Sequence, residues 1–80
     1  MDEKLALIIQ SLRELEEDTQ VPKHVKIRIA NTIKTLDQTS ELSIRVSRAL
    51  SELEELSDDV NMQAFTRTQL FNIVSMLEAI

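Results

Sequence analysis

Apolar residues recur every three or four positions along the chain, which is the spacing of one face of an α-helix. The pattern predicts four helices, over residues 2–18, 22–36, 41–57 and 62–80. In the first three helices the expected buried residues are Leu5, Ile8, Ile9, Leu12, Leu15, Val25, Ile29, Ile33, Leu36, Leu42, Val46, Ala49, Leu50, Leu53 and Leu56. In the last helix the apolar face is wider than a bundle requires and contains Phe65, Leu70, Ile73, Val74, Met76, Leu77 and Ile80.

Capping residues mark the predicted start of each helix. Asp2 is the expected N-cap of the first helix, and Pro22 fixes the backbone angle that the first turn of the second helix requires. Thr39 or Ser40 is the expected N-cap of the third helix, and Asn61 is that of the fourth. The first and third helices end in acidic residues, which are unfavourable at the negative end of a helix dipole.

The chain contains an internal repeat. The sequence LRELEE at residues 12–17 returns as LSELEE at residues 50–55, and the helix that follows each copy repeats the same order of apolar and asparagine positions. The repeat divides one domain, residues 1–80, into two related helical hairpins, 1–38 and 39–80. Two helix pairs are too few for a stable open solenoid. We therefore expect a compact, all-α four-helix bundle in up-down order.

The composition excludes several classes of protein. The 80 residues include no cysteine and no glycine, which rules out disulfides, thiolate metal sites and glycine-rich phosphate loops. The longest apolar run, residues 5–9, is far shorter than the roughly 20 residues of a membrane-spanning helix, and the acidic start does not fit a signal peptide. The net charge of −5 disfavours general attraction to nucleic acid or anionic lipid. We expect a soluble, cytoplasmic protein that does not bind membranes.

Four segments of the chain resemble a family of short archaeal proteins, uncharacterised protein family 0147. They are residues 21–23, 44–47, 53–59 and above all 67–78, RTQLFNIVSMLE. The resemblance covers nearly the whole chain and implies a compact all-helical bundle, without a known activity. The chain departs from the family pattern at Met62 and Gln63, where the family often has an aliphatic residue and proline. It also has Phe71 where the family often has tryptophan, which keeps an aromatic ring at that position.

The sequence offers little for catalysis. Its one histidine, His24, lies between Lys23 and Lys26, whose charges would repel a metal ion. No serine has a base and an orienting acid in a recognisable arrangement. We therefore expect His24 to be a solvated surface residue, and we expect no catalytic residue, no cofactor and no enzymatic activity.

Carboxylates gather at the ends of the first and third helices. By helical spacing, two sets share a face: Glu14, Glu17 and Asp18, and Glu52, Glu55 and Asp59. Neither set has the length or the glycine of a calcium loop. We expect solvated acids that end their helices and no metal site, with the binding of a hard cation as the alternative reading.

Lys23, Lys26 and Lys34 lie on one face of the second helix by spacing. Either they pair with acids of neighbouring helices or remain solvated, or they form a small phosphate-binding face. The second reading makes the protein an accessory binder of nucleic acid or ribonucleoprotein, although no aromatic residue lies among these lysines to stack on bases.

The fourth helix carries the stronger functional signal. Phe71 lies outside the broad apolar face, and its polar neighbours on the helix surface are Arg67, Thr68, Asn72 and Ser75. An aromatic anchor inside a polar rim is typical of a protein interface, although Phe71 could equally pack beneath a neighbouring element. We expect these five residues to bind a protein partner or a second copy of the chain, with Arg67 orienting a partner carboxylate or carbonyl. The sequence thus predicts a non-enzymatic interaction module that binds a protein partner or forms a homo-oligomer.

Overall fold

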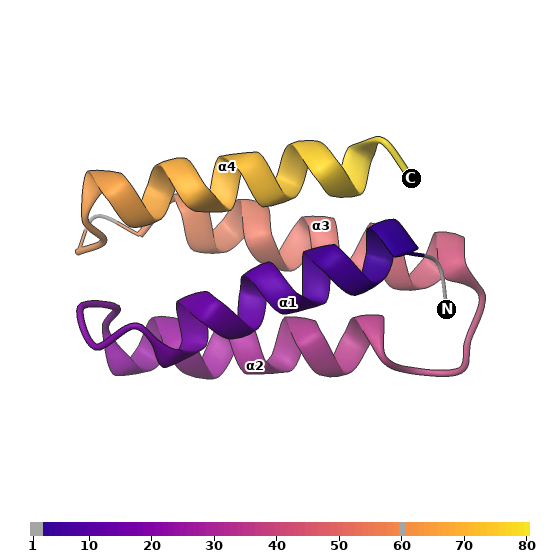
Figure 1. The fold of residues 1–80 in the computed structure, drawn as a ribbon, viewed down its shortest axis with the longest axis horizontal. Coiled ribbons are helices and arrows are strands. Elements are labelled where there is room, and N and C mark those ends of the chain that lie inside the picture. Colours follow the sequence, from indigo (N-terminus) through magenta and orange to yellow (C-terminus); the bar gives the residue numbers. More distant parts are fainter. Residues whose placement is uncertain (1–2, 60) are drawn as a thin grey trace.

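The computed structural model describes residues 3–59 and 61–80, and it contains four helices. They are α1 (Glu3–Glu17), α2 (Lys23–Leu36), α3 (Leu42–Ser57) and α4 (Ala64–Glu78), and no strand occurs in these residues. Consecutive helices run antiparallel, so the two ends of the chain lie at the same end of the molecule (Figure 1). Each helix packs against the next, and α1 also packs against α4. The prediction of an all-α four-helix bundle is confirmed.

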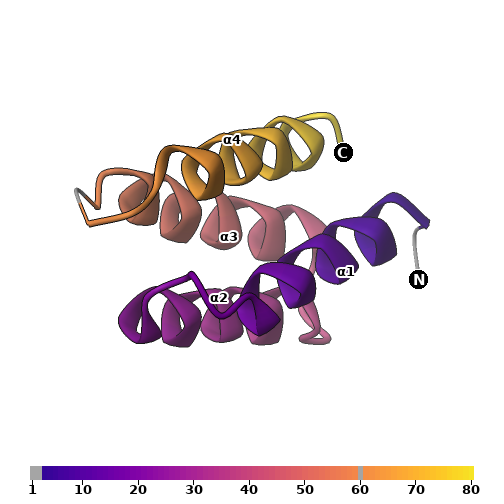
Figure 2. The ribbon, with the colours of Figure 1, turned by 60° about the vertical axis from the view of Figure 1, so that its left-hand side comes forward.

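The bundle consists of two helical layers. Figure 2 shows α1 beside α2 in one layer and α3 beside α4 in the other. The core between the layers is built from aliphatic side chains and one methionine, because each helix buries the stripe that its three- and four-residue spacing creates. The predicted buried residues of α1 and α2 all lie in this core. Partly buried side chains at its edge are Leu42, Val46, Leu50 and Ile80.

Two helices begin at residues that the sequence pattern did not identify. The N-cap of α3 is Glu41, whose carbonyl accepts hydrogen bonds from the backbone N–H groups of Ile44 and Arg45, so the prediction of Thr39 or Ser40 was wrong. The N-cap of α4 is Gln63, so the prediction of Asn61 was also wrong. The predicted cap of α1, Asp2, lies outside the described residues.

The connection between α3 and α4 explains the late start of α4. The Asn61 backbone N–H donates to Asp59 Oδ1 over 2.9 Å, and the Met62 N–H donates to the Asp59 carbonyl. These two bonds tie Asn61 and Met62 back to Asp59, beyond the end of α3. The Met62 side chain is buried in the core. Residues 61 and 62 are thus held outside the helix, and α4 begins after them.

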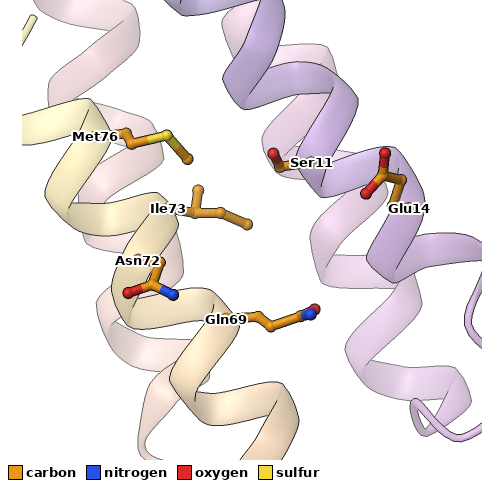
Figure 3. Close-up of a pocket in the computed structure, with 6 residues that line it drawn as sticks. All are labelled: Ser11, Glu14, Gln69, Asn72, Ile73 and Met76. Carbon is orange, nitrogen blue, oxygen red and sulfur yellow. The ribbon is translucent and has the colours of Figure 1, made fainter.

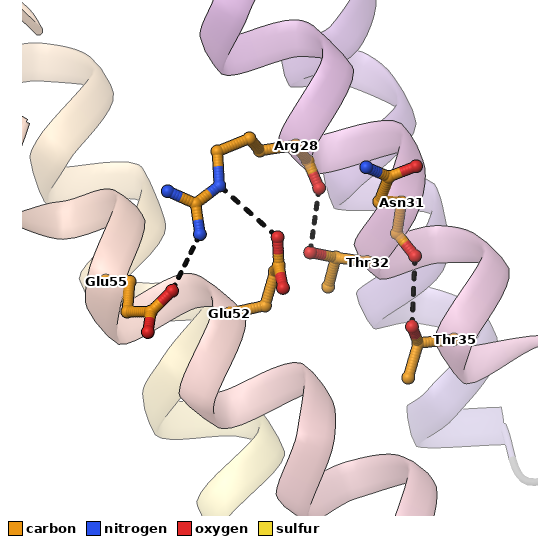
Figure 4. Close-up of polar contacts among 6 residues, drawn as sticks. All are labelled: Arg28, Asn31, Thr32, Thr35, Glu52 and Glu55. Atoms are coloured by element: carbon orange, nitrogen blue, oxygen red, sulfur yellow. Dashed lines mark hydrogen bonds and ion pairs between the residues drawn. The ribbon is translucent and has the colours of Figure 1, made fainter.

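Two buried polar residues, Thr32 and Thr66, interrupt the aliphatic core. The Thr32 hydroxyl donates to the Arg28 carbonyl one turn earlier in α2, at 3.0 Å (Figure 4). This bond satisfies the hydroxyl within its own helix, which removes most of the cost of burying it. A helical pattern of apolar residues alone does not identify such positions, because threonine is read as polar.

Candidate interaction surface

The chain's two aromatic residues, Phe65 and Phe71, both lie exposed on α4. Phe65 is 63% exposed and Phe71 is 54% exposed, while Met76 on the same helix is also exposed. The core-facing side of α4 consists of Thr66, Leu70, Ile73, Val74 and Leu77. The broad apolar face predicted for this helix is thus only partly buried, because a bundle covers about one side of each helix. Phe71 is a surface residue, so it does not pack beneath a neighbouring element of the described chain.

The five residues predicted to bind a partner divide into two groups. Phe71, Asn72 and Ser75 are exposed, as is Thr68, whose hydroxyl donates to the Ala64 carbonyl at 3.0 Å. Arg67 is partly buried, and its Nη2 donates to the backbone carbonyl of Asp59 over 2.8 Å. This bond ties the first turns of α4 to the preceding connection. Arg67 is therefore held by the fold, and we leave it out of the surface that meets a partner.

Asp59, at the end of α3, is the centre of a polar cluster that joins three parts of the bundle. Its Oδ2 lies 2.6 Å from Nε2 of His24 in the first turn of α2. Its Oδ1 accepts the backbone N–H of Asn61, and Arg67 binds its carbonyl. The Asn61 N–H, followed by the His24 ring, lowers the pKa of the Asp59 carboxyl below its ordinary value. His24, expected to be a solvated residue, thus has a partner 35 positions along the chain.

A second polar cluster joins α2 to α3. Arg28 donates from Nη2 to Glu55 over 2.8 Å and from Nε to Glu52 over 3.3 Å (Figure 4). The hydrogen bond to Glu55 is the largest cause of a raised pKa of Arg28. These two acids belong to the set whose spacing suggested a cation site, and the third member, Asp59, is bound to His24. Within the described residues, no group of three or more acidic, histidine or cysteine side chains could hold a metal ion.

The lysines of α2 form no such pairs. Lys23 and Lys34 are exposed and Lys26 is half-buried. None of them forms an ion pair within residues 3–59 and 61–80, where Arg13 pairs with Asp37, and Arg28 with Glu52 and Glu55. The reading in which these three lysines pair with acids of neighbouring helices is wrong, and they present their charge to solvent.

A shallow groove lies between α1 and α4. Gln69, Ile73 and Met76 extend from α4 toward α1, which presents Ser11 and Glu14 (Figure 3). This part of the groove has a volume of about 170 Å³ and is also lined by Asn72. Asn72 therefore belongs to the groove, about 100° around the helix from Phe71.

Farther along the same two helices, a more apolar pocket of about 240 Å³ is lined by Lys4, Leu7, Met76 and Ala79. Met76 lines both hollows, so they are neighbours along the edge between α1 and α4. Leu7 is 64% exposed beside the pocket. This groove was not predicted from the sequence. The available signal was Leu7, an apolar residue outside the buried stripe of its helix.

Comparison with known proteins places these features on a recognised fold. The profile of an uncharacterised protein family, UPF0147, matches residues 1–80. A UPF0147 protein of Sulfurisphaera tokodaii is 38% identical over 79 residues, covering 96% of this chain and 88% of the relative. One from Thermoplasma volcanium is 41% identical over 75 residues, covering 91% of this chain and 83% of the relative.

Two crystal structures resemble this chain throughout. A protein of unknown function, MMP1188, has a TM-score of 0.92 and 39% sequence identity, and the match covers 98% of this chain and 90% of the other. A UPF0147 protein from Thermoplasma acidophilum has a TM-score of 0.91 and 35% identity, with 95% and 91% covered. In the described residues, none of the helices is both long and apolar enough to span a bilayer.

Proposed function

Since the chain belongs to the uncharacterised protein family UPF0147, whose name assigns no activity, we propose its function from the geometry of its surface. We propose that it is a non-enzymatic protein-binding module of the archaeal cytoplasm that contacts its partner through the exposed side of α4 around Phe71. The absence of cysteine is compatible with a reducing, intracellular setting.

One observation carries this proposal: the two aromatic rings of the chain lie on the surface of one helix, while the core is filled without them. A phenylalanine is among the most favourable residues to bury, at roughly 1.5–3 kcal/mol for a whole side chain. Leaving Phe71 half in water forgoes part of that gain, which a partner recovers by covering the ring. Thr68 and Ser75 supply the polar rim that surrounds aromatic anchors in protein interfaces.

Site-specific photo-crosslinking tests the proposal. Phe71 is replaced by p-benzoylphenylalanine in the native cell, and Ser51, an exposed residue of α3, is replaced by the same group as a matched control. We expect one protein, or a second copy of the chain, to be linked at position 71 and not at position 51. The product should survive nuclease treatment. It should be displaced by excess unlabelled wild type, but not by Phe71→Glu. Equal labelling at both positions would contradict the proposal.

A second candidate function rests on the unpaired lysines of α2. Lys23, Lys26 and Lys34 have no acidic partner within the described residues, and α2 itself contains no acid. They support an accessory role in binding the phosphates of nucleic acid. Titration with RNA and with duplex DNA at low salt tests this, because phosphate contacts weaken steeply as salt rises. An absence of binding at low salt, or binding unchanged when the three lysines are replaced by glutamine, would remove this candidate.

A further inference from the structure

Two exposed rows of side chains, one on α1 and one on α2, share the same spacing and carry opposite charge. The α1 row is Glu3, Leu7 and Glu14. The α2 row is Lys23, Ile27 and Lys34. In each row the apolar residue follows the first charge by four positions and precedes the second by seven. At about 100° per residue, the three members of a row therefore lie within about 40° of one another on their helix.

All six side chains of these rows are accessible to a partner. Leu7 and Ile27 are 64% and 55% exposed, although each is a large aliphatic residue. None of the four charged residues forms an ion pair in the part of the chain that the structure describes. The helices as a whole also differ in charge: α2 carries four lysine and arginine residues and no acid, whereas α1 carries four acids and two bases.

The α1 row lies beside a pocket that can hold an apolar side chain. Leu7, at its middle, borders the pocket of about 240 Å³ between α1 and α4. Met76 and Ala79 supply the α4 wall of this pocket, and Lys4 lines it as well. The pocket is open to solvent, while Ile27 projects from the surface of α2 with no neighbour that buries it. The chain thus carries both an apolar hollow and a side chain to fill it.

We propose that α2 of one copy docks on the α1–α4 edge of another copy, parallel to α1, with Ile27 in the pocket beside Leu7. In this register the two lysines of the α2 row face the two glutamates of the α1 row. The opposite direction fits less well, because a spacing of four would then face a spacing of seven and each charge pair would be displaced by about 4.5 Å.

The interface is heterologous, because each copy offers two different surfaces. A dimer leaves one α2 row and one α1 row unused, so further copies add until a ring closes or a chain of copies forms. One helix lying along the edge of two others buries less than a standard interface, so the association is weak and responds to concentration. It goes beyond the proposed function, because it uses α2 and the α1–α4 edge rather than the Phe71 side of α4.

Sedimentation equilibrium of the full chain tests the inference. We measure wild type up to about 1 mM at about 0.01 M ionic strength, where the screening length is about 30 Å. We expect association that weakens as salt is added. Glu14→Lys and Lys34→Glu should each weaken it by about tenfold, because an attraction becomes a repulsion. Circular dichroism should show unchanged folding, since both residues are exposed.

The matched control separates this interface from the effect of net charge. Glu54, an exposed residue of α3, makes no ion pair within the described part of the chain, and Glu54→Lys changes the net charge in the same direction as Glu14→Lys. Both changes reduce the general repulsion between copies, so net charge alone predicts stronger association for both. We expect Glu54→Lys to associate at least as well as wild type, while Glu14→Lys associates less.

Combining the two reversals gives the decisive result. A chain carrying both Glu14→Lys and Lys34→Glu has its charge pair restored in the opposite sense, so it should associate more tightly than either single variant. An equimolar mixture of the two single variants should associate more tightly than either variant alone, because every contact between unlike copies then joins opposite charges at positions 14 and 34. A wild type that stays monomeric throughout, or a double variant no tighter than the singles, would overturn the inference. Crosslinking at position 71 is independent of either result and tests the proposed function separately.

Discussion

Leu70 and Phe71 are neighbours in the sequence, but the structure gives them opposite roles. The Leu70 side chain is fully buried, whereas about half of Phe71 is in water. Leu70→Ala leaves a cavity in the core, and such truncations cost about 3–5 kcal/mol. Phe71→Ala removes a larger side chain, yet it should cost only about 1 kcal/mol, because roughly half of the 1.5–3 kcal/mol for burying a phenylalanine is realised. Truncation of the smaller residue, Leu70, should therefore cause the larger loss of unfolding free energy.

The difference is large on the scale of this protein. At 0.05–0.15 kcal/mol per residue, a chain of this length has a free energy of unfolding of roughly 4–12 kcal/mol. Leu70→Ala thus removes a large part of it, and Phe71→Ala a small part. Urea unfolding is followed by far-ultraviolet circular dichroism, since the chain has no tryptophan or tyrosine whose fluorescence would report on the core.

The comparison has a clear failing result. If Phe71→Ala lowers the free energy of unfolding as much as Leu70→Ala does, the ring is packed in the core and the proposed surface loses its anchor. If both substitutions lower the free energy of unfolding by less than about 1 kcal/mol, the placement of Leu70 in a packed core is wrong. Retention of the wild-type m-value in both variants shows that the same surface is exposed on unfolding.

Three further predictions concern the charged groups. The pKa of Asp59 is lowered in the fold, so the stability that its ionised form contributes is present above the ordinary aspartate value of about 3.9 and is lost as the pH falls through the lower folded value. When helicity is followed as the pH falls, Asp59→Asn should therefore lose it less steeply than wild type. Identical pH profiles of the two proteins would contradict this. Arg28→Met should lower the free energy of unfolding by about 1 kcal/mol or less, because the pairs of Arg28 with Glu52 and Glu55 are partly exposed. Urea titration should show that added salt reduces the difference in unfolding free energy between this variant and wild type. Millimolar Mg²⁺ or Ca²⁺ should leave the melting temperature unchanged, since Glu52 and Glu55 already bind Arg28; a rise would restore the cation-binding reading.

The helices and most of the core follow directly from the sequence. Apolar spacing places Leu12 and Ile29, for example, on buried stripes, because a helix repeats every 3.6 residues whatever surrounds it. Pro22 likewise marks the start of α2 to within one residue. These features depend on local geometry, which the order of residues determines.

Features made by distant residues could not be predicted in the same way. The contact between His24 and Asp59 spans 35 positions and depends on the end of α3 reaching the start of α2. The bond from Arg67 to the Asp59 carbonyl depends on the path of a turn. Spacing also cannot say how much of a wide apolar face the neighbouring helices cover, so the exposure of Phe65 and Phe71 required the packed bundle.

The order in which the helices meet also has a kinetic consequence. In the described bundle, α1 packs on α2, α2 on α3 and α3 on α4, whereas the α1–α4 edge brings together segments from opposite ends of the sequence. Local contacts lose little loop entropy before they form, which is why helical bundles fold within microseconds to milliseconds. The hairpins should therefore assemble first and the α1–α4 seam should close last. The contact between α1 and α4 should also have the lowest free energy of local opening. The pocket beside Leu7 would then lie in the part of the bundle that opens most often.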